Sequence, residues 1–120
     1  MVSVEDHLRN KPETSVVLWH AFVELIERCG EFTYSPSKTT VTFKGTRRGF
    51  AGARPDRRGI VGYLDLQRKV RDSRITNVSA YTAKLFVHQF RITVPEQLDE
   101  TFAGWVAEAY AVGQGAHLAR

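Results

Sequence analysis

Apolar side chains recur at three- and four-residue steps in two segments, one near each end of the chain. In the first segment, residues 13–29, they share one stripe: Leu18, Phe22, Leu25, Ile26 and Cys29. After Pro95 a second stripe follows: Leu98, Phe102, Trp105, Val106, Ala109 and Tyr110. This spacing is typical of amphipathic helices. Gly30 and Gly113 stand where the two helices are expected to end.

Between these segments apolar and polar positions alternate, which indicates half-buried β-strands. The pattern covers residues 31–34, 39–44, 49–53, 60–66, 74–79 and 85–94, of which the first is short and the fifth is weak. Short strands separated by turn residues favour an antiparallel meander. We therefore expect an α+β fold with an N-terminal helix, an antiparallel sheet of about five strands, and a C-terminal helix packed on one face of the sheet.

The length and composition fit one domain, residues 1–120, with a frayed tail after about residue 113. Apolar residues make up 42% of the chain, which is enough to build a core. The single cysteine, Cys29, fits a reducing compartment. The first ten residues lack the apolar run of a signal peptide, and no apolar stretch approaches the roughly 20 residues that span a membrane. The sequence therefore predicts a cytoplasmic protein.

The net charge of +4 is concentrated in the middle of the chain. Residues 38–74 hold eleven basic and three acidic side chains, a net charge of +8, whereas the segments on either side are net negative. Such a basic segment favours an anionic partner, although arginines on exposed hairpins also serve solubility alone. The candidate contacts with an anionic partner are Arg47, Arg48, Arg54, Arg57 and Arg58. Nucleic acid is a weakly supported partner, because the chain lacks the RNP aromatic signature, a helix-turn-helix and a zinc finger.

Five short motifs, taken in order, resemble a small bacterial family catalogued as a domain of unknown function (number 5655). They are Val4-Glu5-Asp6-His7-Leu8 with Lys11-Pro12, Ser37-Lys38-Thr39, Phe50-Ala51-Gly52, Val87-His88-Gln89-Phe90-Arg91, and Ala109-Tyr110-Ala111-Val112-Gly113. The resemblance extends over nearly the whole chain. It implies a helix–sheet–helix domain and implies no activity.

The central segment also holds the candidate site residues. His88 shares an apolar strand face with Phe86 and Phe90, so it is either a satisfied core residue or the polar point of a pocket. In the second case Tyr63, Tyr81, Lys38 and Lys84 are candidate partners on neighbouring strands. We therefore take Lys38, Tyr63, Tyr81 and His88 as the candidate ligand-binding set, and His88 as a weak catalytic candidate.

Metal and cofactor chemistry find no support in the sequence. The four histidines, His7, His20, His88 and His117, show no close ligand spacing, and one cysteine cannot build a structural zinc site. The chain has no phosphate-binding loop and no Gly-x-Ser-x-Gly nucleophile motif. We therefore expect no bound metal and no cofactor.

Three hypotheses for the function follow. The first is a non-catalytic binding or accessory module whose basic sheet region meets an anionic small molecule or protein. The second is a small enzyme that uses His88 with a nearby tyrosine or lysine. The third is an interaction domain that dimerises through its sheet, because Leu85 and Val87 make the second sheet face partly apolar.

Overall fold

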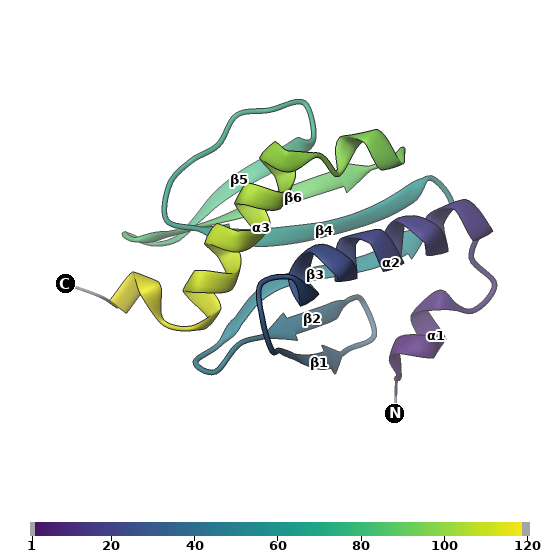
Figure 1. Cartoon of the computed structure of the whole chain (residues 1–120), viewed down its shortest axis with the longest axis horizontal. Helices are drawn as coiled ribbons and strands as arrows, with labels where there is room; N and C mark the ends of the chain where they lie inside the picture. Colours follow the sequence, from purple (N-terminus) through teal and green to yellow (C-terminus); the bar gives the residue numbers. More distant parts are fainter. Residues whose placement is uncertain (1, 119–120) are drawn as a thin grey trace.

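The computed structural model describes residues 2–118, which form α-helices and a β-sheet (Figure 1). The α-helices of these residues are α1 (Val4–Leu8), α2 (Glu13–Glu27) and α3 (Glu100–Gly113). The strands are β1 (Thr33–Pro36), β2 (Val41–Lys44), β3 (Gly49–Asp56), β4 (Gly59–Leu66), β5 (Ile75–Thr82) and β6 (Leu85–Ile92). The predicted helix–antiparallel sheet–helix fold is confirmed, with six strands instead of about five.

The strand order is β1-β2-β3-β4-β6-β5, and every neighbouring pair is antiparallel. The predicted meander therefore holds only through β4, because β6 lies between β4 and β5. The connection from β4 to β5, residues 67–74, is long enough to pass one strand position, whereas only Ala83 and Lys84 join β5 to β6. The last two strands consequently form a hairpin that pairs with β4 through its second strand.

The start of the C-terminal helix differs from expectation, whereas its end at Gly113 is as predicted. The helix does not start near Pro95, which instead opens a 3₁₀ turn (Pro95–Gln97). Asp99 caps α3, since its carboxylate accepts a hydrogen bond from the Phe102 N–H at 2.9 Å. Residues 116–118 form a second 3₁₀ turn after α3, and residues 119–120 of the expected frayed tail lie outside the described residues.

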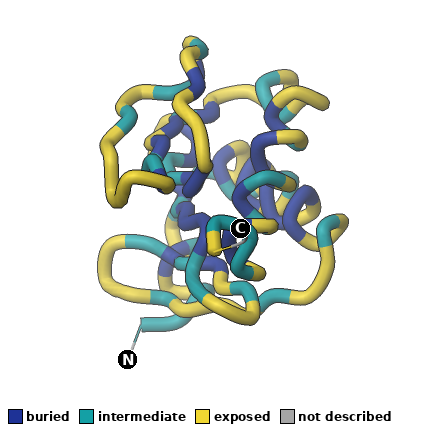
Figure 2. Tube along the Cα trace, turned by 90° about the vertical axis from the view of Figure 1, so that its left-hand side faces the viewer, coloured by how far each residue is buried: buried dark blue, intermediate teal, exposed yellow. Residues whose placement is uncertain are grey.

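The core lies between the sheet and the two long helices, which cover the same sheet face (Figures 1 and 2). Phe22 of α2 is fully buried and its ring centroid lies 5.6 Å from Phe43 of β2, 5.4 Å from Phe90 of β6 and 6.2 Å from Phe102 of α3. Each such buried side chain contributes about 2–3 kcal/mol of transfer free energy. No helix among residues 2–118 is long and apolar enough to cross a membrane.

The opposite face of the sheet, called here the open face, is covered by neither of the two long helices. Strand alternation and register place the side chains of these residues on it: Thr42, Arg54, Asp56, Val61, Tyr63, Asp65, Val87, Gln89 and Arg91. Most of them are polar or charged, so this face remains compatible with water. Gly52 lies among them, and the Tyr63 ring packs directly over it. A Cβ at residue 52 would collide with this ring.

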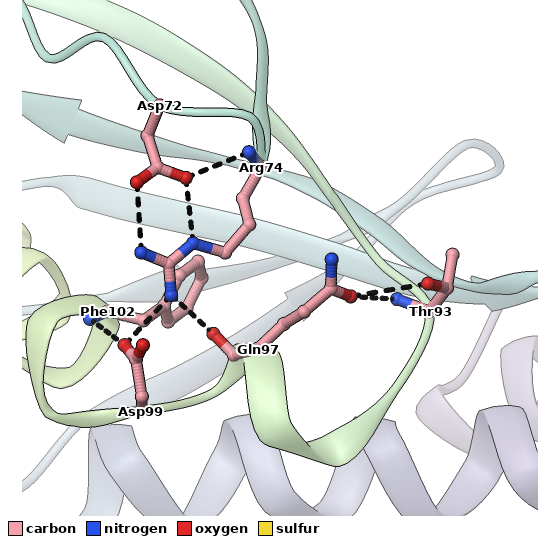
Figure 3. A network of polar contacts seen from close by, with 6 residues as sticks. All are labelled: Asp72, Arg74, Thr93, Gln97, Asp99 and Phe102. Carbon is pink, nitrogen blue, oxygen red and sulfur yellow. Dashed lines mark hydrogen bonds and ion pairs between the residues drawn. The ribbon is translucent and has the colours of Figure 1, made fainter.

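The loop of residues 67–74 is fixed by Arg74 (Figure 3). The guanidinium donates to both carboxylate oxygens of Asp72, at 2.8 and 3.1 Å. It also donates to the Gln97 carbonyl oxygen at 2.7 Å and to Asp99 at 2.8 Å. The group stacks over Trp105 with 4.8 Å between Cζ and the ring centroid. Arg74 therefore ties the crossing loop to the start of α3, with four of its five guanidinium N–H groups hydrogen-bonded.

Replacing Arg74 with alanine is expected to lower the free energy of unfolding by about 3–5 kcal/mol, because Asp72 and the Gln97 carbonyl lose a buried partner. Arg68→Ala is the matched control from the same loop. Arg68 also forms a two-bond ion pair, with Glu108, but its side chain is 57% exposed, so its loss should cost less than about 1 kcal/mol. Urea unfolding measures both, and equal losses would contradict this interpretation.

Candidate functional site

His88 is fully buried on the helix-covered face of β6. Its Nε2 accepts a hydrogen bond from the Val70 backbone N–H at 2.9 Å, and its Nδ1 donates to the Phe86 carbonyl oxygen at 3.0 Å. Burial lowers the pKa of His88, so the ring stays neutral. With both nitrogens bonded to backbone, His88 holds the crossing loop against the sheet and has none left for proton transfer.

The other members of the candidate ligand-binding set lie elsewhere. Lys38 is exposed in the turn between β1 and β2, which His7 fixes by a 2.6 Å hydrogen bond between its Nε2 and the Ser37 carbonyl oxygen. Tyr63 and Tyr81 come together on the open face, where both line one hollow. The structure thus joins two of the four predicted residues and separates them from Lys38 and His88.

This hollow has a volume of about 540 Å³ and is lined by Arg48, Gly49, Tyr63, Asp65, Tyr81 and Val87. We call it the Asp65 hollow. Tyr81 is 64% exposed, whereas Tyr63 is half-buried and its hydroxyl lies 3.4 Å from Thr42 Oγ1. The Arg48 guanidinium lies 5.3 Å from the centre of the Tyr81 ring, which is cation–π contact. An arginine and two tyrosines therefore surround a buried carboxylate.

Arg48 is positioned by the end of α3. The turn between β2 and β3 donates three backbone N–H groups to that helix end: Thr46 to Gln114 Oε1 at 2.9 Å, and Arg47 and Arg48 to the Gly113 carbonyl oxygen at 2.9 and 3.3 Å. Unpaired carbonyls at a helix C-terminus readily accept such bonds. The helix-covered side of the molecule thus fixes the turn that presents Arg48 to the open face.

Asp65 is the unusual group of the hollow. Its side chain is 4% exposed, and it accepts one hydrogen bond, to Oδ2 from Arg48 Nη2 at 3.0 Å. Its other oxygen, Oδ1, is buried and has no hydrogen-bond partner among the described residues. Burial raises the pKa of Asp65 to about 6, and the neighbouring Arg48 opposes that rise. A carboxylate in this state is under-satisfied, which is uncommon for a buried charge.

The other arginine–aspartate pair of the open face shows the contrast. Asp56 receives two hydrogen bonds from Arg91, at 3.1 and 2.7 Å, and a third from the Arg58 backbone N–H. These bonds lower the pKa of Asp56 to about 2. Asp56 is thus a satisfied structural carboxylate, whereas Asp65 has spare bonding capacity next to a hollow.

A second hollow of about 350 Å³ adjoins the first, because both are lined by Tyr63 and Val87. Its remaining lining residues are Thr40, Arg54, Val61, Gly62 and Gln89. We call the two together the open-face trough. Of the five arginines predicted to meet an anion, Arg48 and Arg54 line this trough. Arg47 is exposed outside it, and Arg57 and Arg58 lie in the turn between β3 and β4, beside Lys11.

A larger hollow of about 820 Å³ lies where the end of α2 meets β1, and its lining includes Glu27, Phe32, Tyr34 and Lys44. Its only shifted titratable group is Tyr34, whose pKa is raised by burial and by Glu27. No buried polar atom without a partner lines it among residues 2–118. The smaller Asp65 hollow is therefore the better candidate site. The described residues also contain no group of three His, Cys, Asp or Glu side chains that could hold a metal ion.

Sequence reasoning missed Asp65. The available signal was an acidic residue between Leu64 and Leu66 in an otherwise apolar strand. Its partner Arg48 was predicted only as one of several surface arginines, since the pair is separated by 17 residues and depends on the turn at the end of α3.

Comparison with known proteins gives one match. A family model described as "Domain of unknown function (DUF5655)" matches residues 4–113, nearly the whole chain. No curated protein and no solved structure matches the chain significantly.

Replacing His88 with leucine should release the crossing loop while filling most of the same space. The Val70 N–H loses its buried acceptor, which should cost about 1–3 kcal/mol of unfolding free energy and speed exchange of the Val70 amide hydrogen about tenfold or more. His20→Leu on the exposed side of α2 is the control and should change stability by less than about 0.5 kcal/mol. If the Val70 amide is as protected against hydrogen exchange in His88→Leu as in wild type, His88 does not hold the crossing loop.

Asp65→Asn should remove a pH dependence of stability. The folded-state pKa of about 6 lies above the ordinary aspartate value of 3.8, so between pH 3.8 and 6 the native protein holds a proton that the unfolded chain has lost, and wild-type stability falls as pH rises through this window. Above pH 6 the variant should therefore gain up to about 3 kcal/mol relative to wild type, and nothing near pH 3.

The matched control is Asp56→Asn on the same face. Its folded-state pKa of about 2 lies below the ordinary aspartate value of 3.8, so its contribution to stability is present above pH 3.8 and is lost as pH falls toward 2. This variant should be about 2 kcal/mol less stable than wild type at pH 7. Urea unfolding at several pH values measures the stability of both variants. Stability changes of the same sign in the two variants at pH 7 would contradict the assignment of Asp65.

Proposed function

The chain belongs to the DUF5655 family, whose description assigns no activity, and we propose that it is a non-catalytic binding module that takes an anionic ligand along its open-face trough. The observation that carries the proposal is Arg48, a partly exposed guanidinium at the wall of a hollow that also contains two tyrosines and the under-satisfied Asp65 carboxylate. Buried polar groups normally find a partner within the protein. One that does not, beside a cavity, is a binding-site candidate.

The charges of the trough favour an anion over a cation. Asp56 and Arg91 neutralise one another, and Asp65 is paired with Arg48, so Arg54 leaves the open face with one excess positive charge. The exposed Arg47, Arg57 and Arg58 extend the positive field beyond the ends of the trough. Such a field attracts anions from solution before any specific contact is made.

The tyrosines favour a ligand with a flat or apolar part next to its anionic group. Tyr81 presents an exposed ring at one end of the trough, and Tyr63 with Val87 forms the wall common to both hollows. Aromatic rings beside arginines are the usual means of holding planar groups without a deep pocket. Catalysis by His88 has no comparable support, because both of its ring nitrogens are bonded to backbone. Dimerisation through the sheet stays a prediction.

The binding function is tested with two fluorescent polyanions at low salt, an octathymidylate and an octaglutamate peptide. At least one should bind, and Arg48→Ala and Arg54→Ala should each weaken binding about five- to tenfold, which corresponds to about 1 kcal/mol or more per contact. Arg47→Ala removes a neighbouring exposed charge outside the trough and should weaken binding less than twofold. Fluorescence anisotropy measures the affinities.

Two results would overturn the proposal. One is the absence of binding by either polyanion at low salt. The other is an equal loss in Arg47→Ala and Arg48→Ala, which would show diffuse attraction to surface charge. Selective binding of one polyanion identifies whether phosphates or carboxylates suit the trough.

A further inference from the structure

We propose that an oxyanion binds in the Asp65 hollow by taking the Arg48 guanidinium away from Asp65, and that Asp65 accepts a proton from solvent in exchange. This inference rests on the proposed binding function and names the chemistry of its central contact. Its premise is geometric: among residues 2–118, Arg48 is the only ion-pair partner of the buried Asp65 carboxylate, and the same arginine lines the hollow.

Arg48 is free to change partner. Its side chain is 29% exposed, whereas that of Arg74 is 8% exposed and committed to four hydrogen bonds. Arg48 donates through Nε to the Gly49 carbonyl oxygen at 2.9 Å and through Nη2 to Asp65. Asp65 takes one of the two Nη2 hydrogens, and an oxyanion held by Nη1 and Nη2 in a bidentate grip takes the other. Binding therefore places a second negative charge beside Asp65 on the same guanidinium, and this repulsion favours exchange of the partner.

Asp65 cannot keep its charge once Arg48 leaves. A buried carboxylate without a counter-charge is strongly unfavourable, and the ordinary response is protonation. Of the described residues that line the hollow, none besides Arg48 is a cation: Tyr63 lies two positions before Asp65 on β4, Tyr81 comes from β5, and Val87 is the partner of Asp65 on β6. Burial raises the pKa of Tyr63, so that phenol stays neutral at neutral pH. The proton goes to an Asp65 oxygen and gives a neutral carboxyl group.

The exchange predicts tighter binding at lower pH. In the protein without ligand Asp65 has a pKa of about 6, and departure of the Arg48 guanidinium raises this pKa further. The bound state therefore holds one more proton than the free state in the window above pH 6. Affinity should rise by up to about tenfold for each unit by which pH falls between 8 and 6, and then level off. A phosphate or a carboxylate on the ligand would both serve as the oxyanion.

The test uses two small probes whose own charge is constant in this window, sulfate for phosphate-like ligands and formate for carboxylates. Titrations followed by the backbone amide NMR signals of Gly49 and Tyr63, which line the hollow, give the affinity at pH 6, 7 and 8. Wild type should show the rise, whereas Asp65→Asn, which carries a permanently neutral side chain, should bind at every pH as wild type does at pH 6. Arg48→Ala should bind neither probe in the hollow, and Arg47→Ala should match wild type.

A second measurement needs no variant: the carboxyl carbon signal of Asp65 in the wild-type protein should titrate at a higher pH when the probe is saturating. Pronounced binding of formate but not sulfate assigns a carboxylate ligand, and the reverse assigns a phosphate. Arg48-dependent binding with a flat pH profile, or an unmoved Asp65 titration, would overturn the exchange while leaving the binding function intact. Failure of both probes to shift the Gly49 and Tyr63 amide signals, even in Asp65→Asn at low salt, would overturn both the exchange and the binding function.

Discussion

The packing of both long helices on one face of the sheet is the constraint on which the rest of the structure depends. Phe22 joins the layers, since it contacts an aromatic ring on β2, on β6 and on α3. Because the apolar residues of the strands are used on that side, alternation directs their polar residues to the other. The open face is thus a consequence of core formation, and its chemistry is free to vary without disturbing the helices.

The fold could be read from the sequence to the extent that it depends on local periodicity. The stripes of α2 and α3 and the alternation of the strands are local signals, and they led to the correct class. The position of β6 between β4 and β5 was not predictable in this way. It depends on residues 67–74, a segment without an alternating apolar pattern that nevertheless buries Val70 and Arg74. Buried contacts of a loop leave no periodic trace.

His88 and Asp65 show where reasoning from sequence stops for a site. For His88 the alternation gave the correct face, but its partners are backbone groups of Val70 and Phe86, which no side-chain pattern reveals. Asp65 was overlooked because one acid in a strand resembles any surface charge. Its character comes from Arg48, brought near by a turn that hydrogen-bonds to the end of α3. Tyr63 and Tyr81 were found, yet for a hollow that does not contain His88.

The two arginine–aspartate pairs of the open face differ in how well the fold satisfies their carboxylates. Arg91 and Asp56 make two hydrogen bonds while each remains about one quarter exposed, so the pair keeps part of its hydration. Arg48 and Asp65 make one, with the carboxylate almost fully buried. Burial of a charge with so few bonds lowers stability compared with a well-packed apolar residue. A group that costs the fold in this way, beside a hollow, is better explained by what enters the hollow than by what holds the sheet together.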